Sequence, residues 1–135
     1  MTLSKRLRKM QRTPPHSLTR CELEVMQVVW ARGAVTVQDV VDALERSLAY
    51  TTVMTTLKIL ADKSVLRRKK QGRAHVYEAE VTRDEVCQSM TRELSVRLFR
   101  GSAKSMVLNL LGHEKLSASD IDELKSAIAS LEEST

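Results

Sequence analysis

The amino-acid sequence predicts a mainly α-helical protein that carries one small antiparallel β-hairpin. Apolar residues recur at helical spacing through most of the 135 residues, whereas one basic stretch alternates as strands do. Only 3% of the residues are aromatic, so aliphatic side chains must fill the core, which is typical of packed helices. The longest apolar runs fall far short of the roughly 20 residues that a membrane-spanning helix needs. Because no secretory signal follows the basic N-terminus either, we expect a cytoplasmic protein.

Caps and apolar spacing predict the first two helices. Ser17 or Thr19 can cap the first helix after Pro14-Pro15, and Gly33 ends it. Its apolar positions share one side, namely Leu18, Leu23, Met26, Val29 and Trp30. Thr36 begins a short second helix over residues 36–47. The stripe that this helix is expected to bury consists of Val37, Val40, Val41 and Leu44.

A third helix is predicted over residues 48–64, and a β-hairpin follows it. Val53, Leu57 and Leu60 recur at helical spacing and therefore share one face. The opposite, exposed face then carries Thr51, Thr55, Lys58 and Asp62. In residues 65–81, two short strands flank a turn at Gln71-Gly72. Three helices followed by such a hairpin form a winged helix-turn-helix, in which the third helix enters the major groove of DNA.

The C-terminal residues are predicted to form three further helices that need a partner. Thr82 with Glu85 matches a capping box, Gly101 and Gly112 end helices, and Ser117 or Ser119 caps the last one. Helices of this size enclose little core by themselves, so we expect a second copy of the chain to cover their apolar faces. The candidate dimerisation residues are Val86, Met90, Leu94, Leu98, Met106, Val107, Leu110, Leu111, Ile121, Leu124, Ile128 and Leu131.

The net charge of +5 is distributed unevenly and separates three regions. Residues 1–15 hold five basic side chains and no acidic one, and are predicted to form a flexible arm. Residues 1–80 hold 15 basic and 8 acidic side chains (+7), whereas residues 81–135 hold 7 and 9 (−2). We place the winged helix-turn-helix at 16–80 and the dimerisation domain at 81–135. The basic N-terminal part favours a polyanionic partner.

Several motifs occur together in the first 80 residues. They are L-T-x-x-E-x-x-V-M-x-x-x-W over residues 18–30, T-V-x-x-V over 36–40, Y-T-T-V-x-T-x-L-x-x-L over 50–60, and Gly72-Arg73-Ala74 with Tyr77. In this combination the sequence resembles the penicillinase-repressor (BlaI/MecI) family of bacterial transcriptional repressors. The resemblance implies a homodimer that blocks transcription from a pseudo-palindromic operator with TACA/TGTA-like half-sites.

The chemistry of the third helix and the hairpin fits contact with DNA. Threonine hydroxyls can bond to phosphates and bases, and threonine methyls can meet the methyl group of thymine. Basic side chains of the hairpin can follow the phosphate backbone. The candidate DNA-binding residues are Tyr50, Thr51, Thr52, Thr55, Lys58, Arg67, Arg68, Lys69, Lys70 and Arg73. Taken alone, the threonines also fit an ordinary exposed helix face, and Tyr50 also fits a packing residue.

For family members that respond to penicillin, the resemblance implies induction by cleavage of an Asn-Phe bond, with a sensor-controlled protease as a further partner. The matching bond here is Asn109-Leu110, in which leucine replaces phenylalanine. A cut there would separate the last helix from the DNA-binding half. The same residues also fit a simple dimer core with Asn109 as an exposed neighbour.

Other function classes find less support in the sequence. The copper-responsive relatives carry a C-terminal Cys-x-Cys motif, which is missing here, and Cys21 and Cys87 lie too far apart to resemble a metal knuckle. We therefore expect no cofactor and no metal, with a metal-sensing repressor as an alternative. A winged-helix module that binds proteins is a second alternative. We find no convergent group of acid, base and nucleophile, and expect no enzyme.

Overall fold

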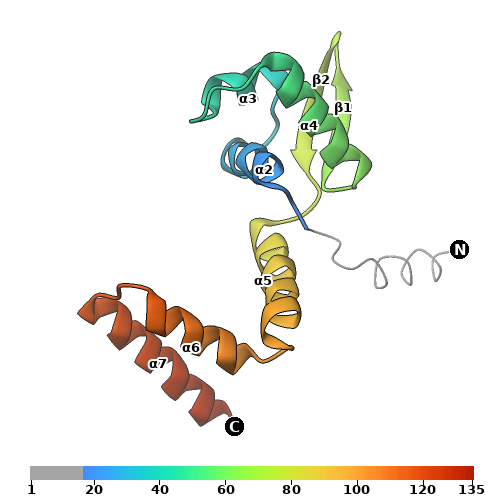
Figure 1. Ribbon diagram of the computed structural model, residues 1–135. Helices are drawn as coiled ribbons and strands as arrows, with labels where there is room; N and C mark the ends of the chain where they lie inside the picture. Colours follow the sequence, from blue (N-terminus) through green and yellow to red (C-terminus); the bar gives the residue numbers. More distant parts are fainter. Residues whose placement is uncertain (1–16) are drawn as a thin grey trace, which may run out of the picture. The chain divides into compact units, whose positions relative to one another are not determined.

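The computed structural model describes residues 17–135 and confirms the mainly α-helical, winged helix-turn-helix fold (Figure 1). The basic arm predicted over residues 1–15 lies outside this range. The described elements, in chain order, are α2 (Arg20–Arg32), α3 (Val37–Ala43), α4 (Tyr50–Asp62), β1 (Leu66–Gln71), β2 (Ala74–Ala79), α5 (Arg83–Phe99), α6 (Ala103–His113) and α7 (Ala118–Ser134). None of the helices in residues 17–135 is both long and apolar enough to cross a membrane.

The chain divides into two compact units, and the break falls between Glu93 and Leu94, inside α5. The sequence predicts an earlier boundary, with the dimerisation domain beginning at residue 81. The difference arises because the first turns of α5 pack on the N-terminal core. Val86 is buried in that core, and Met90 packs against it.

The N-terminal unit is built around α2 and α4, whose apolar faces meet. Val25, Met26, Val53, Leu57 and Leu60 are completely buried in this core. Helix α2 begins at a side-chain cap that the sequence offers. Between the two predicted caps of α2, the structure selects Thr19, whose hydroxyl accepts a hydrogen bond from the Glu22 amide at 3.2 Å.

Helix α3 is shorter than predicted. Thr36 caps it in a capping box with Asp39, as its position suggested, but the helix ends at Ala43 rather than continuing to residue 47. Leu44 adopts an extended conformation and packs against the core. Arg46 then reaches back to α2, where its guanidinium lies 2.7 Å from Glu24. The extended conformation at Leu44 thus coincides with its packing against the core and with this ion pair.

One further residue, Val35, pairs with the two-stranded hairpin, and the spacing did not predict this contact. Strands β1 and β2 pair with Arg67 opposite Glu78 and Lys70 opposite His75, and Gly72 turns between them with φ of +64°. Val35 forms an isolated bridge to Tyr77, with amide-to-carbonyl distances of 3.0 and 2.8 Å. Tyr77 is buried, so it anchors the hairpin to the core.

Ser64 follows α4 in a left-handed backbone conformation, with φ of +64°. Side chains with a Cβ atom disfavour this region, whereas glycine adopts it readily. We expect Ser64→Gly to raise the free energy of unfolding by about 0.5–1 kcal/mol, because relief of this strain outweighs the added freedom of the unfolded chain. Urea denaturation of both proteins measures the difference. Ser102→Gly is the matched control, because Ser102 has φ of −85° and caps α6; it should give no gain, and a loss of stability in Ser64→Gly would contradict the prediction.

The C-terminal unit contains the rest of α5, then α6 and α7. Ser102 caps α6, and Ser117 caps α7 in a capping box with Asp120. No residue of α6 or α7 is buried, although both helices are amphipathic. Large apolar side chains are therefore exposed on this unit, namely Leu94, Val96, Leu98, Val107, Leu108, Leu110, Leu111, Leu116, Ile121, Leu124, Ile128 and Leu131.

Candidate nucleic-acid interface

Helix α4 presents a polar face to solvent because its apolar face is used for packing. Val53, Leu57 and Leu60 point into the core, and Thr56 is buried with them. The structure places the predicted contact residues of this helix on the other side, where Thr51, Thr52, Thr55 and Lys58 are all exposed. These side chains form one continuous face, which we call the reading face.

Thr55 is oriented by a hydrogen bond within the helix. Its hydroxyl donates to the Thr51 carbonyl at 2.9 Å. The hydroxyl proton is therefore already used, and the side chain offers an acceptor oxygen and a methyl group outward. Those groups suit a base edge with an amino donor or a thymine methyl, rather than a phosphate, which only accepts hydrogen bonds.

Sequence reasoning missed Ile59 as a member of the reading face. It lies one turn after Thr55 and keeps 42% of its surface exposed, although it is large and apolar. An exposed isoleucine beside threonine methyls extends the apolar part of this face. Its spacing from Thr52 and Thr55 places it on the same helix face, but polar contact chemistry alone does not identify an isoleucine.

The N-terminus of α4 is open to a ligand. Ala49 occupies the capping position and provides no side-chain hydrogen bond, and Tyr50, the first helical residue, is 49% exposed. Amide groups at an uncapped helix N-terminus favour phosphate. The exposure of Tyr50 argues against a purely packing role for its ring.

The C-terminal end of α4 is fixed to α2 by an ion pair between an exposed lysine and a buried carboxylate. The Glu22 carboxylate is only 4% exposed and accepts hydrogen bonds from Lys63 Nζ at 2.8 and 3.1 Å. Burial raises the pKa of Glu22, but hydrogen bonds from Lys63 and Thr19 outweigh it and hold that pKa below its usual value. Sequence reasoning identified Glu22 only as part of a motif, and missed its partner.

The five basic residues predicted on the hairpin have different surroundings. Arg67 pairs with Glu78 at 2.8 Å and with Glu80 at 3.3 Å, and Lys69 lies 3.4 Å from Glu78. Hydrogen bonds from Arg67 and Lys69 lower the pKa of Glu78, so this carboxylate is charged at neutral pH. Arg68, Lys70 and Arg73 are exposed, and among residues 17–135 they have no acidic partner within salt-bridge distance.

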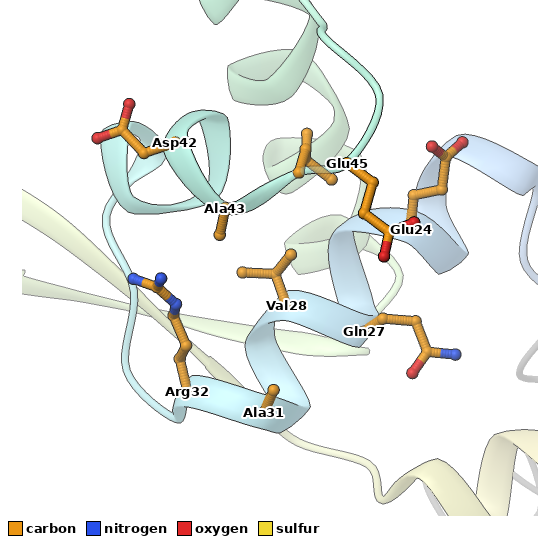
Figure 2. Close-up of a pocket in the computed structure, with 9 residues that line it drawn as sticks. Glu24, Gln27, Val28, Ala31, Arg32, Asp42, Ala43 and Glu45 are labelled. Atoms are coloured by element: carbon orange, nitrogen blue, oxygen red, sulfur yellow. The ribbon is translucent and has the colours of Figure 1, made fainter.

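A shallow pocket lies between α2 and α3, on a different surface from the reading face (Figure 2). Figure 2 shows Val28 and Ala31 on α2 facing Ala43 on α3, with Arg32 and Asp42 toward one side. Its lining contains carboxylates and one guanidinium but no serine, cysteine or histidine. None of the predicted contact residues lines this pocket, which therefore adds nothing to the candidate interface.

The predicted dimerisation residues fall into two groups. Val86 and Met90 pack on the N-terminal core, so we remove Val86, which is 2% exposed, from the candidate dimer surface. The other members lie on the C-terminal unit, where Met106 is half-buried and the rest are exposed. Asn109 and Leu110 lie inside α6, and the Asn109 carbonyl is 2.8 Å from Nδ1 of His113.

The two cysteines lie in different surroundings. Cys21 is half-buried with Sγ 3.5 Å from the Thr56 hydroxyl, and Cys87 is exposed on α5. In the described part of the chain, no three histidine, cysteine or acidic residues are grouped to hold a metal ion.

Comparison with known proteins gives consistent matches over most of the chain. A family model described as "Penicillinase repressor" matches residues 18–130. The chain is 37% identical over 115 residues to the transcriptional regulator BlaI of Mycobacterium tuberculosis, covering 82% of each protein. It is 30% identical over 109 residues to the penicillinase repressor of Bacillus licheniformis, covering 79% of this chain and 85% of that protein.

One solved structure shows the same fold at low sequence identity. The YusO protein from Bacillus subtilis is 16% identical, with a TM-score of 0.51 over 99% of this chain and 92% of that one.

Proposed function

The chain belongs to the penicillinase repressor family, and from this premise we propose that it is a sequence-specific DNA-binding repressor that acts as a homodimer. The observation that supports this function best is the exposed, threonine-rich reading face of α4 in the same compact unit as the basic hairpin. A helix that offers methyls and acceptors can read base edges, while basic side chains beside it hold the phosphate backbone. Binding to chromosomal DNA would place the protein in the bacterial cytoplasm.

The proposed operator is a pseudo-palindrome with TACA/TGTA-like half-sites, one for each copy of the reading face. Two half-sites match a symmetric dimer because each copy of α4 meets an equivalent major groove. The uncovered apolar residues of the C-terminal unit support the dimer, since exposed groups of this kind mark interaction surfaces.

A gel shift at several salt concentrations tests the function. The protein should bind a promoter fragment with a half-site pair about 10³-fold or more tightly than a random duplex, and both affinities should fall steeply with salt. Equal affinity for the two duplexes at every salt concentration would overturn the proposal.

Thr55 and Arg73 should affect binding in different ways. We expect Thr55→Ala to weaken operator binding by about tenfold and to leave binding to random DNA nearly unchanged, because its contact is with a base. Arg73→Ala should weaken both by a similar factor and reduce the salt slope by about 1, because its contact is with a phosphate. Fluorescence anisotropy with the two duplexes measures both. The reverse pattern would mean that the base contact assigned to Thr55 and the phosphate contact assigned to Arg73 are both wrong.

We also propose that repression is relieved by proteolysis at the Asn109-Leu110 bond. A cut there would separate α7 from the winged-helix unit and remove much of the apolar surface that we assign to the dimer. Because the bond lies within α6, this helix must unwind before a protease can bind it in extended form. The length of the chain in cells before and after cell-wall stress tests this step, and an intact chain after induction would exclude it.

A further inference from the structure

Acidic partners divide the basic residues of the hairpin into two sets. Arg67 and Lys69 lie on one face of the hairpin and share Glu78, which stands directly opposite Arg67 in the strand register. Glu80 directly follows the last residue of β2, and its carboxylate lies 3.3 Å from the Arg67 guanidinium. Arg68 and Lys70, which alternate with them, lie on the other face, and Arg73 lies at the turn.

We propose that Glu78 is a negative determinant that limits the attraction of this hairpin to DNA, so that Arg68, Lys70 and Arg73 provide its phosphate contacts. This inference rests on the proposed function, because it assigns roles within the same DNA interface. The chemical class of the ligand is the phosphodiester backbone of double-stranded DNA.

The geometry explains why Glu78 weakens this attraction. One carboxylate within 2.8 and 3.4 Å of two cations cancels one of their two charges, and Glu80 reduces the rest. The guanidinium of Arg67 is also directed to carboxylate oxygens: Nη2 donates to Glu78 at 2.8 Å and Nε lies 3.3 Å from Glu80, so these two nitrogens face carboxylates when a phosphate approaches. Each phosphate contact contributes through release of counterions, and a cation neutralised within the protein releases fewer of them.

The consequence concerns specificity more than affinity. Attraction to phosphate is the same for every DNA sequence, so extra unpaired cations tighten binding to random and operator DNA alike. A repressor must find few operators among a large excess of other sites, and unlimited attraction to phosphate would hold it elsewhere. Glu78 pairs with two of the five cations of the hairpin. The hairpin therefore stays basic, but its phosphate contacts do not outweigh the base contacts of the reading face.

The test uses the full chain and a random-sequence duplex, with affinity measured by fluorescence anisotropy across a series of salt concentrations. We expect Glu78→Gln to bind this duplex roughly 3- to 10-fold more tightly at about 0.1 M salt, and to steepen the salt slope by about 1–2. Glu85→Gln is the matched control, because it removes the same charge from an exposed position on α5, outside the hairpin; its affinity should rise much less. Equal effects of the two substitutions would overturn the proposal.

A second pair of variants separates release of Arg67 from a simple change in net charge. In the parent protein, Arg67→Ala should reduce the salt slope by less than half as much as Arg68→Ala. In the Glu78→Gln background the two effects should become similar, because Arg67 is then available to phosphate. If Glu78→Gln raises affinity equally with and without Arg67, the carboxylate acts through net charge alone and the assignment is wrong.

These outcomes are distinct from failure of the proposed function. If the parent protein shows no salt-dependent DNA binding at all, the repressor proposal fails before Glu78 is tested. If the parent protein prefers its operator but Glu78→Gln leaves random binding and salt slope unchanged, the function stands and the role of Glu78 is overturned.

Discussion

The double substitution of Leu124→Asp with Ile128→Asp is expected to prevent formation of the proposed homodimer and to weaken binding to the full proposed operator by about 100-fold or more. Both side chains lie one turn apart on α7, and they are 38% and 52% exposed. Two carboxylates on each copy would bring like charges together in an apolar contact and leave them poorly solvated. Two linked reading faces gain about 10²–10⁴ in avidity over one, and a monomer loses that gain.

Sedimentation velocity and anisotropy with full and half operators measure the two effects. Binding to an isolated half-site should change little, because each winged-helix unit keeps its own core. The matched control is the double substitution of Ser126→Asp with Ser130→Asp, which adds the same two charges on α7, one turn apart and away from the Leu124 and Ile128 stripe. A variant that remains dimeric, or that loses full-site and half-site affinity equally, would show that α7 does not hold the dimer.

Local patterns in this sequence predicted local structure well. Thr36 and Ser117 cap helices where a hydroxyl residue precedes an apolar stripe, and Gly72 turns the hairpin. These features depend on residues within one helical turn or one β-turn, so their chemistry can be read from adjacent letters. The order of helices and hairpin then sufficed to predict the winged helix-turn-helix.

Contacts between distant residues were harder to predict. Val35 was placed in no element, yet it pairs with Tyr77, and nothing near either residue identifies the other. The same holds for Glu22 and Lys63, which are 41 positions apart. Pairing across such separations depends on the packing of the whole unit, which periodicity does not describe.

Helix α5 shows a further limit of periodicity. Val86, Met90, Leu94 and Leu98 recur every four residues and read as one apolar stripe. The helix crosses the break between the two units, so its first turns pack on the winged-helix core while Leu94 and Leu98 are exposed. A repeat shows which face of a helix is apolar, but it does not show which partner covers each part.

Glu22→Ala is expected to lower the free energy of unfolding by about 2–3 kcal/mol. The substitution removes a buried carboxylate that accepts two hydrogen bonds from Lys63 and one from the Thr19 amide, so it breaks an ion pair and half of a capping box together. The loss stays below that of a fully buried pair because the Lys63 side chain is 42% exposed and can return to water. Thermal and urea denaturation measure it.

The matched control is Glu24→Ala, two positions further along α2. Glu24 also pairs with an arginine, Arg46 at 2.7 Å, but the pair is more exposed to solvent. Exposed pairs contribute little to stability, so this variant should lose far less than Glu22→Ala. Equal losses would mean that the burial of Glu22 does not determine its contribution.

The pH dependence of stability gives an independent measure of the same ion pair. Since the pKa of Glu22 is lower in the folded chain than in the unfolded one, its contribution is complete above the ordinary glutamate value of 4.5. It is lost as the pH falls through the folded pKa, where the carboxylate takes up a proton and releases Lys63. Wild type should therefore exceed Glu22→Gln in stability at neutral pH, and the gap should narrow below about pH 4.5. Because Lys63 caps the C-terminal end of α4, Glu22→Gln should also weaken operator binding more than random binding at neutral pH. If this gap in stability does not change with pH, the contribution of Glu22 to the free energy of unfolding comes from packing alone. The ion pair with Lys63 would then have no part in positioning α4.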